Sequence, residues 1–142
     1  MSFWDSSAIV PLCVNEDRSQ SARRLWRLFP EHYVWRQSVV EVESTFARLV
    51  REGALNPDAF SVALKQLSAI EIRWLPIESN SRVIEIARTL PRQYGLRAMD
   101  SLQLAAALVC CKEFPKGKDF IAADEKLLKA ADAIGFIVHD LS

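Results

Sequence analysis

The chain has 142 residues, of which 50% are hydrophobic and 25% are charged, and these are the proportions of an ordinary globular domain. No stretch approaches the roughly 20 consecutive apolar residues that a membrane span needs, so we expect no membrane association. Eighteen Lys and Arg residues balance eighteen Asp and Glu residues. The resulting formal net charge of zero excludes a general electrostatic attraction to nucleic acid, so a polyanionic partner would need a local basic patch.

The length indicates a single domain, residues 1–142, and the sequence contains no linker and no internal repeat. Residues 1–5 include neither a basic segment nor a signal-like apolar stretch, so we expect the protein to be cytoplasmic. Cys13, Cys110 and Cys111 each lie in apolar sequence, which indicates reduced and buried thiols.

Five short segments rich in β-branched and aromatic residues predict strands. They cover residues 2–4, 32–35, 72–77, 119–123 and 136–138. The third segment contains Pro76, which cannot donate to a sheet hydrogen bond and therefore predicts an edge strand or a strand end.

Apolar residues at helical spacing, bounded by capping residues and glycines, predict helices between these strands. The helices cover residues 8–14, 18–29, 38–52, 57–70, 81–90, 97–111 and 124–133. In the helix over 97–111 the predicted buried face consists of Leu102, Ala105, Ala106 and Val109. Alternating strands and helices predict an α/β domain whose mainly parallel central sheet is covered by helices on both faces.

Acidic residues fall at matching places in this pattern. Asp5 follows the first predicted strand, Asp124 follows the fourth, and Asp100 lies in the first turn of its helix. Glu41 and Glu43 lie in the first turns of the helix that follows the second strand. Each acid alone is an ordinary helix cap or surface charge. Because functional crevices of parallel sheets lie at the carboxyl ends of the strands, we expect these acids to converge there.

Convergent carboxylates raise one another's pKa, and a divalent cation that prefers oxygen ligands, Mg²⁺ or Mn²⁺, removes that cost. No competing site is visible, because His32 and His139 are isolated and the cysteines lack the spacing of metal ligands. The sequence also has no Gly-rich phosphate loop and no Gly-x-Ser-x-Gly motif. A metal held by carboxylates, without another nucleophile, points to hydrolysis of a phosphodiester.

Four segments in this order resemble the PIN-domain family, and specifically the VapC-type toxins of prokaryotic toxin–antitoxin pairs. They are residues 4–8, 41–48, 97–108 and 120–127, followed by Ala130, Ala131 and Gly135. The resemblance covers nearly the whole chain and implies a PIN-like three-layer sandwich. It also implies a metal-dependent endoribonuclease that hydrolyses RNA with Mg²⁺ or Mn²⁺. The partners it implies are an RNA substrate, a small cognate antitoxin and a second copy of the chain in a homodimer.

By this resemblance the catalytic, metal-holding residues are Asp5, Glu41, Asp100 and Asp124. Glu41 has the family's spacing to the small residue and the arginine that follow it on its helix. Glu43 lies nearer the apolar stripe of that helix and remains the alternative. Arg97, one turn before Asp100, is expected either to meet an RNA phosphate or to pair with a surface acid.

The chain departs from the family pattern at two positions. Ala122 stands where a Ser or Thr is common two residues before the last acid, and Trp35 stands where a Ser is common six residues before the second. We expect Ser6, Ser7 or backbone groups to replace the missing hydroxyl of residue 122. The departure at Ala122 keeps one alternative open, a catalytically degenerate PIN-like module that acts by binding protein. A receiver-type phosphoacceptor domain is set aside, because Ser6 and Ser7, not a second acid, follow Asp5.

Overall fold

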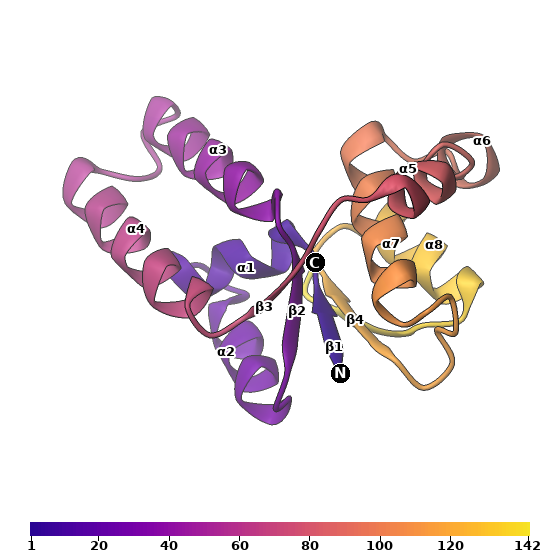
Figure 1. Ribbon diagram of the computed structural model, residues 1–142. Coiled ribbons are helices and arrows are strands. Elements are labelled where there is room, and N and C mark those ends of the chain that lie inside the picture. The colour runs from indigo at the N-terminus through magenta and orange to yellow at the C-terminus, as the bar shows by residue number, and fades with distance from the viewer.

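The computed structural model describes the whole chain, from Met1 to Ser142, and is built around one five-stranded sheet (Figure 1). The strands are β1 (Ser2–Trp4), β2 (His32–Trp35), β3 (Leu75–Ile77), β4 (Asp119–Ala122) and β5 (Ile137–Asp140). Their order in the sheet is β3-β2-β1-β4-β5, and every neighbouring pair is parallel. The predicted α/β class and the edge position of the third strand are therefore confirmed, and the sheet is wholly parallel.

Eight helices form the two outer layers. On one side of the sheet are α1 (Ser6–Cys13), α2 (Ser19–Leu28), α3 (Ser38–Arg51) and α4 (Pro57–Glu71). On the other side are α5 (Ser81–Ala87), α6 (Leu90–Tyr94), α7 (Ala98–Cys110) and α8 (Glu125–Ile134). Figure 1 shows the first four helices at the left of the sheet and the last four at the right. The chain thus has the expected three-layer arrangement, and none of its helices is long and apolar enough to cross a bilayer.

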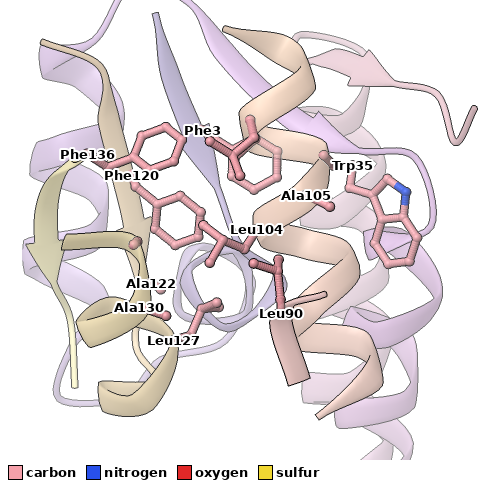
Figure 2. Packing of buried hydrophobic residues seen from close by; sticks show 14 of the residues in the cluster. Phe3, Trp35, Leu90, Leu104, Ala105, Phe120, Ala122, Leu127, Ala130 and Phe136 are labelled. Carbon is pink, nitrogen blue, oxygen red and sulfur yellow. The ribbon is translucent and has the colours of Figure 1, made fainter. Parts of the chain in front are cut away.

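Each central strand sends alternate side chains into two separate hydrophobic cores. Phe3, Trp35 and Phe120 pack with α5 to α8, whereas Trp4 and Ile121 pack with α1 to α4. The rings of Phe3 and Phe120 stack with their centroids 5.4 Å apart (Figure 2). Burial on both faces explains why these strands read as continuous apolar runs in the sequence.

The third strand is shorter than predicted, since residues 72–74 form a turn that follows the end of α4 at Glu71. The backbone N–H groups of Arg73 and Trp74 both donate to the carbonyl of Ile70, so this stretch continues the helical turn instead of pairing with β2. Sheet pairing starts only at Leu75, opposite Tyr33. The β-branched and aromatic residues of this segment therefore predicted the start of the strand too early, because the backbone N–H groups before Leu75 are already bonded to the last turn of the preceding helix.

The predicted helix over 81–90 is also divided. Helix α5 ends at Ala87, and a separate short helix, α6, begins at Leu90. Pro91 explains the break, because proline lacks an N–H and its ring clashes with the carbonyl four residues earlier in a continuous helix. At the start of a new helix the same residue is well tolerated, and Pro91 lies in the first turn of α6.

The cysteines are all free, and two of the three are buried, whereas Cys110 is only partly buried. The two histidines, although isolated in sequence, each have a partner in the fold. His32 stacks on Trp26 with ring centroids 3.6 Å apart, and His139 Nε2 lies 2.8 Å from Asp119 Oδ1 across β4 and β5. Neither histidine contributes to the acidic cluster described below.

Candidate active site

Four carboxylates lie at the edge where the strands end. Asp5 follows β1 and Asp124 follows β4, and these two strands are paired neighbours. Glu41 lies in the first turn of α3 and Asp100 in the first turn of α7. The acids come from segments up to 119 residues apart, and the parallel sheet brings them to one place.

Asp5 is the most deeply buried of the four, with 3% of its surface exposed. It caps α1 by accepting the N–H of Ser7 at 3.0 Å, and the hydroxyl of Ser7 also donates to the same oxygen, Oδ2. Burial raises the pKa of Asp5 to about 7, and the negative charges of Glu41 and Asp100 add to the increase against the lowering effect of the two Ser7 hydrogen bonds. The buried carboxyl thus binds a proton far more tightly than an ordinary aspartate.

Ser7 also joins the first acid to the last. Its Oγ accepts the N–H of Ala123 at 2.8 Å while donating to Asp5, so one hydroxyl links the end of β1 to the turn before Asp124. Ala122, the position where the family pattern has a hydroxyl, is fully buried in the core. The hydroxyl of Ser7 therefore lies at the carboxyl end of the strands, close to residue 122, which has no hydroxyl of its own.

Glu41 is half-buried, and Gln103 of α7 donates a hydrogen bond to its Oε1 at 2.6 Å. Burial raises the pKa of Glu41, and the charge of Asp100 raises it further, whereas hydrogen bonds from Gln103 and Ser6 act in the opposite direction. Glu43, two residues along α3, is exposed to solvent. Of the two glutamates, only Glu41 lies among the other acids.

Asp100 is the centre of the cluster, because it interacts electrostatically with each of the other three carboxylates. Its pKa is raised first by burial and then by the charge of Asp124, while the cations of Arg97 and Lys126 lower it. Asp124 itself caps α8 and accepts the N–H of Leu127 at 2.8 Å. Arg97 is exposed and acts on Asp100 through space, without a salt bridge.

The donor set fits a hydrated cation better than a fully dehydrated one. All four groups offer oxygen atoms, and three of them have raised pKa values that a positive ion would lower. No three Asp, Glu, His or Cys side chains, however, lie close enough together to coordinate one ion directly. Mg²⁺ commonly keeps several waters and uses only one or two protein carboxylates, and this arrangement provides for that kind of binding.

Two adjoining hollows open beside the acids. One, of about 420 Å³, is lined by Glu41 together with Ser6, Val40, Ser44, Thr45 and Met99. The other, of about 250 Å³, shares Ser6 and Thr45 with the first and includes Arg18 and Arg48. No sequence pattern predicted that Arg18 would lie beside the site. The basic residues Arg23, Arg24 and Arg27 on α2 are exposed but line neither hollow.

Gln103 is the site residue that the sequence reasoning missed. Of the predicted buried face of α7, Leu102 and Val109 are only partly buried, whereas Gln103 is fully buried. The available signal was a single amide three residues after Asp100 in an otherwise apolar helix, a spacing that places the two side chains on one face.

Comparison with known proteins establishes the fold. No protein-family model and no curated protein matches the sequence. Among solved structures, PAE2754 from Pyrobaculum aerophilum superposes with a TM-score of 0.68 and 15% identity, covering 96% of this chain and 87% of that one. FitAcB from Neisseria gonorrhoeae superposes with a TM-score of 0.65 and 20% identity, covering 99% and 98%. At these identities the likeness concerns the fold alone, and the chain has a PIN-like three-layer α/β fold.

Proposed function

We propose that the protein is a metal-dependent endoribonuclease, the toxin of a VapBC-type toxin–antitoxin pair. The observation that carries this proposal is the meeting of Asp5, Glu41, Asp100 and Asp124 at the carboxyl edge of a PIN-like sheet. A cluster of four carboxylates with three raised pKa values is costly for a protein without a cation to offset it. The sequence resemblance at the same four segments supports the same activity.

In this proposal the four acids hold Mg²⁺ or Mn²⁺ at the edge of the sheet, partly through water. The bound ion would lower the pKa of a water molecule and offset charge on the phosphate that is attacked. Asp5 is fixed by Ser7 and Glu41 by Gln103, so two of the acids are held in place before a cation arrives. Arg18 and Arg48 line the adjoining hollow, where a guanidinium can meet an RNA phosphate.

The remaining parts of the proposal concern the binding partners and the cellular location of the protein. We propose a small cognate antitoxin, a homodimer and a cytoplasmic location, all of which rest on the resemblance and on the sequence. The zero net charge favours a substrate contact confined to the two hollows beside the acids over a broad electrostatic attraction.

A titration of the purified protein with Mn²⁺, followed by thermal unfolding and by RNA cleavage, tests the proposal. Mn²⁺ should raise the melting temperature by mass action and should support cleavage. Asp100→Asn should abolish cleavage, weaken the response to Mn²⁺ and leave a folded protein. Asp132→Asn, an exposed position on α8, is the matched control and should behave as wild type. Cleavage by a folded Asp100→Asn protein would contradict the assignment.

One observation favours a second candidate, a PIN-like module that acts by binding protein. The acids do not lie close enough for three of them to coordinate an ion directly. If millimolar Mn²⁺ changes neither the melting temperature nor RNA cleavage, this second function replaces the first.

A further inference from the structure

A single buried amide connects the two halves of the acidic site. Gln103 is 0% exposed, and its Nε2 donates one hydrogen bond to Glu41 Oε1 at 2.6 Å and another to Ser38 Oγ at 2.7 Å. These are the only side-chain hydrogen bonds between α3 and α7. The two helices belong to opposite layers of the fold and to different hydrophobic cores. The amide therefore crosses from one layer to the other at the edge of the sheet.

The spacing of residues along each helix places the partners of the Gln103 hydrogen bonds close to two acids of the cluster. Ser38 and Glu41 are three residues apart on α3, and Asp100 and Gln103 are three residues apart on α7, so each pair shares a helix face. The amide of Gln103, one turn after Asp100 on α7, consequently ties α7 to the first turn of α3, so it connects the helices that carry Asp100 and Glu41.

The amide has one orientation that suits the site. Both hydrogens of Nε2 are used, while the buried Oε1 has no hydrogen-bond partner. The opposite orientation would place Oε1 against the carboxylate of Glu41, and two acceptors facing each other at hydrogen-bond distance repel. Leaving a buried carbonyl oxygen unpaired costs about 1–3 kcal/mol. We expect the protein to bear this cost because the amide N–H of Gln103 stabilises the ionised carboxylate of Glu41.

We propose that Gln103 is a positioning residue, which holds the Glu41 carboxylate by Oε1 and leaves Oε2 as the oxygen that meets the cation. This inference rests on the proposed metal-dependent function, because Glu41 is given a role in cation binding there. A donated amide hydrogen bond fixes the rotation of the carboxylate and favours its ionised form. Removing a group that hydrogen-bonds a metal ligand and orients it typically lowers metal affinity about 10–100-fold.

The first test measures Mn²⁺ affinity by the electron paramagnetic resonance signal of free Mn²⁺. Gln103→Leu keeps a similar volume and removes both hydrogen bonds, and its Kd for Mn²⁺ should rise about 10–100-fold. Ser38→Ala removes the other acceptor of the amide and should change the Kd less than about threefold, since the Glu41 bond remains. Ser101→Ala, buried on the same helix and bonded to the carbonyl of Arg97, should leave the Kd unchanged. An equal loss of affinity in all three variants would mean a merely structural role and would overturn the proposal.

The second test needs no metal and separates this inference from the proposed function. In EDTA, the side-chain NH₂ resonance of Gln103, assigned by its loss in Gln103→Leu, should be protected from solvent exchange. It should shift strongly in Glu41→Ala and little in Glu43→Ala. If the resonance does not respond to Glu41, the positioning role is wrong whether or not metal binds. If it responds as expected but Mn²⁺ does not bind, the hydrogen bond is real but the positioning role falls together with the metal-dependent function.

Discussion

Ser7 donates its hydroxyl to Asp5 and accepts the backbone N–H of Ala123, so a side chain of α1 is the connection between the first acid and the loop that carries the last. Both partners are at least partly buried, and water can replace the lost contacts only in part. The consequences of removing this hydroxyl can be measured.

Ser7→Ala should lower the free energy of unfolding by about 1–3 kcal/mol, because it leaves the N–H of Ala123 and an oxygen of Asp5 without this partner. Urea unfolding followed by circular dichroism measures the change. Ser44→Ala, at an exposed position of α3, should cost less than about 0.5 kcal/mol. A Ser7→Ala protein as stable as wild type would show that the bridge contributes little.

Asp5 should make the stability of the metal-free protein depend on pH. Its pKa is raised from 3.8 to about 7 in the folded state, so the folded protein binds the proton more tightly than the unfolded chain. This group therefore stabilises the fold below the unfolded pKa and loses that contribution as the pH rises towards 7. Asp5→Asn lacks the titration but keeps a residue that can cap α1.

The measurement is the difference in unfolding free energy between Asp5→Asn and wild type, in EDTA, from pH 4 to pH 8. This difference should shift in favour of the variant by on the order of 2–4 kcal/mol as the pH rises. Comparing the two proteins cancels the contributions of His32 and of the other groups that do not interact with Asp5. A flat difference would mean that Asp5 is better solvated than its burial indicates.

Glu41 and Glu43 provide a matched pair on one helix. Glu41→Gln should reduce RNA cleavage by on the order of 100-fold or more, because the carboxylate is replaced by a neutral group among the other acids. Glu43→Gln should keep wild-type cleavage, since this side chain is exposed and apart from the cluster. Initial rates at saturating Mn²⁺ distinguish the two, and the reverse result would transfer the role to Glu43.

Leu104 tests the core behind the site. It is fully buried in the cluster that contains Phe3 and Phe120 (Figure 2), and Leu104→Ala should destabilise the protein by about 2–5 kcal/mol. Phe114→Ala removes a larger side chain that is 77% exposed, and should cost less than about 1 kcal/mol. Thermal and urea unfolding of both variants provide the comparison.

The sequence predicted the parts of the fold that depend on local pattern. The strand over 32–35 has the observed bounds, and the third strand lies at the edge as Pro76 indicated. The convergence of Asp5 and Asp124 followed from one rule, that parallel strands end at the same edge. The places of Glu41 and Asp100 followed less directly, from their positions in the first turns of helices.

What the sequence did not predict depends on contacts between distant residues. The hydrogen bond from Gln103 to Glu41 joins positions 62 residues apart, and no local pattern signals which carboxylate a buried amide will meet. The start of β3 was predicted three residues too early, because Ile72 and Trp74 are favourable strand residues. The backbone N–H groups of Arg73 and Trp74 donate instead to Ile70, in the turn after α4. The predicted helix ended at Leu90, so the separate helix α6 was missed, although Pro91 is typical of the first turn of a helix.

The parallel sheet also gives the two chain ends opposite surroundings. Met1 precedes the first residue of β1, at the edge away from the acids, whereas Leu141 and Ser142 follow β5 at the edge that carries them. Arg18 lines both the hollow beside the acids and a second hollow lined by these last residues. An affinity tag fused before Met1 would therefore begin at the opposite end of the strands from the acids. The same tag fused after Ser142 would begin at their end and could compete with a substrate that binds there.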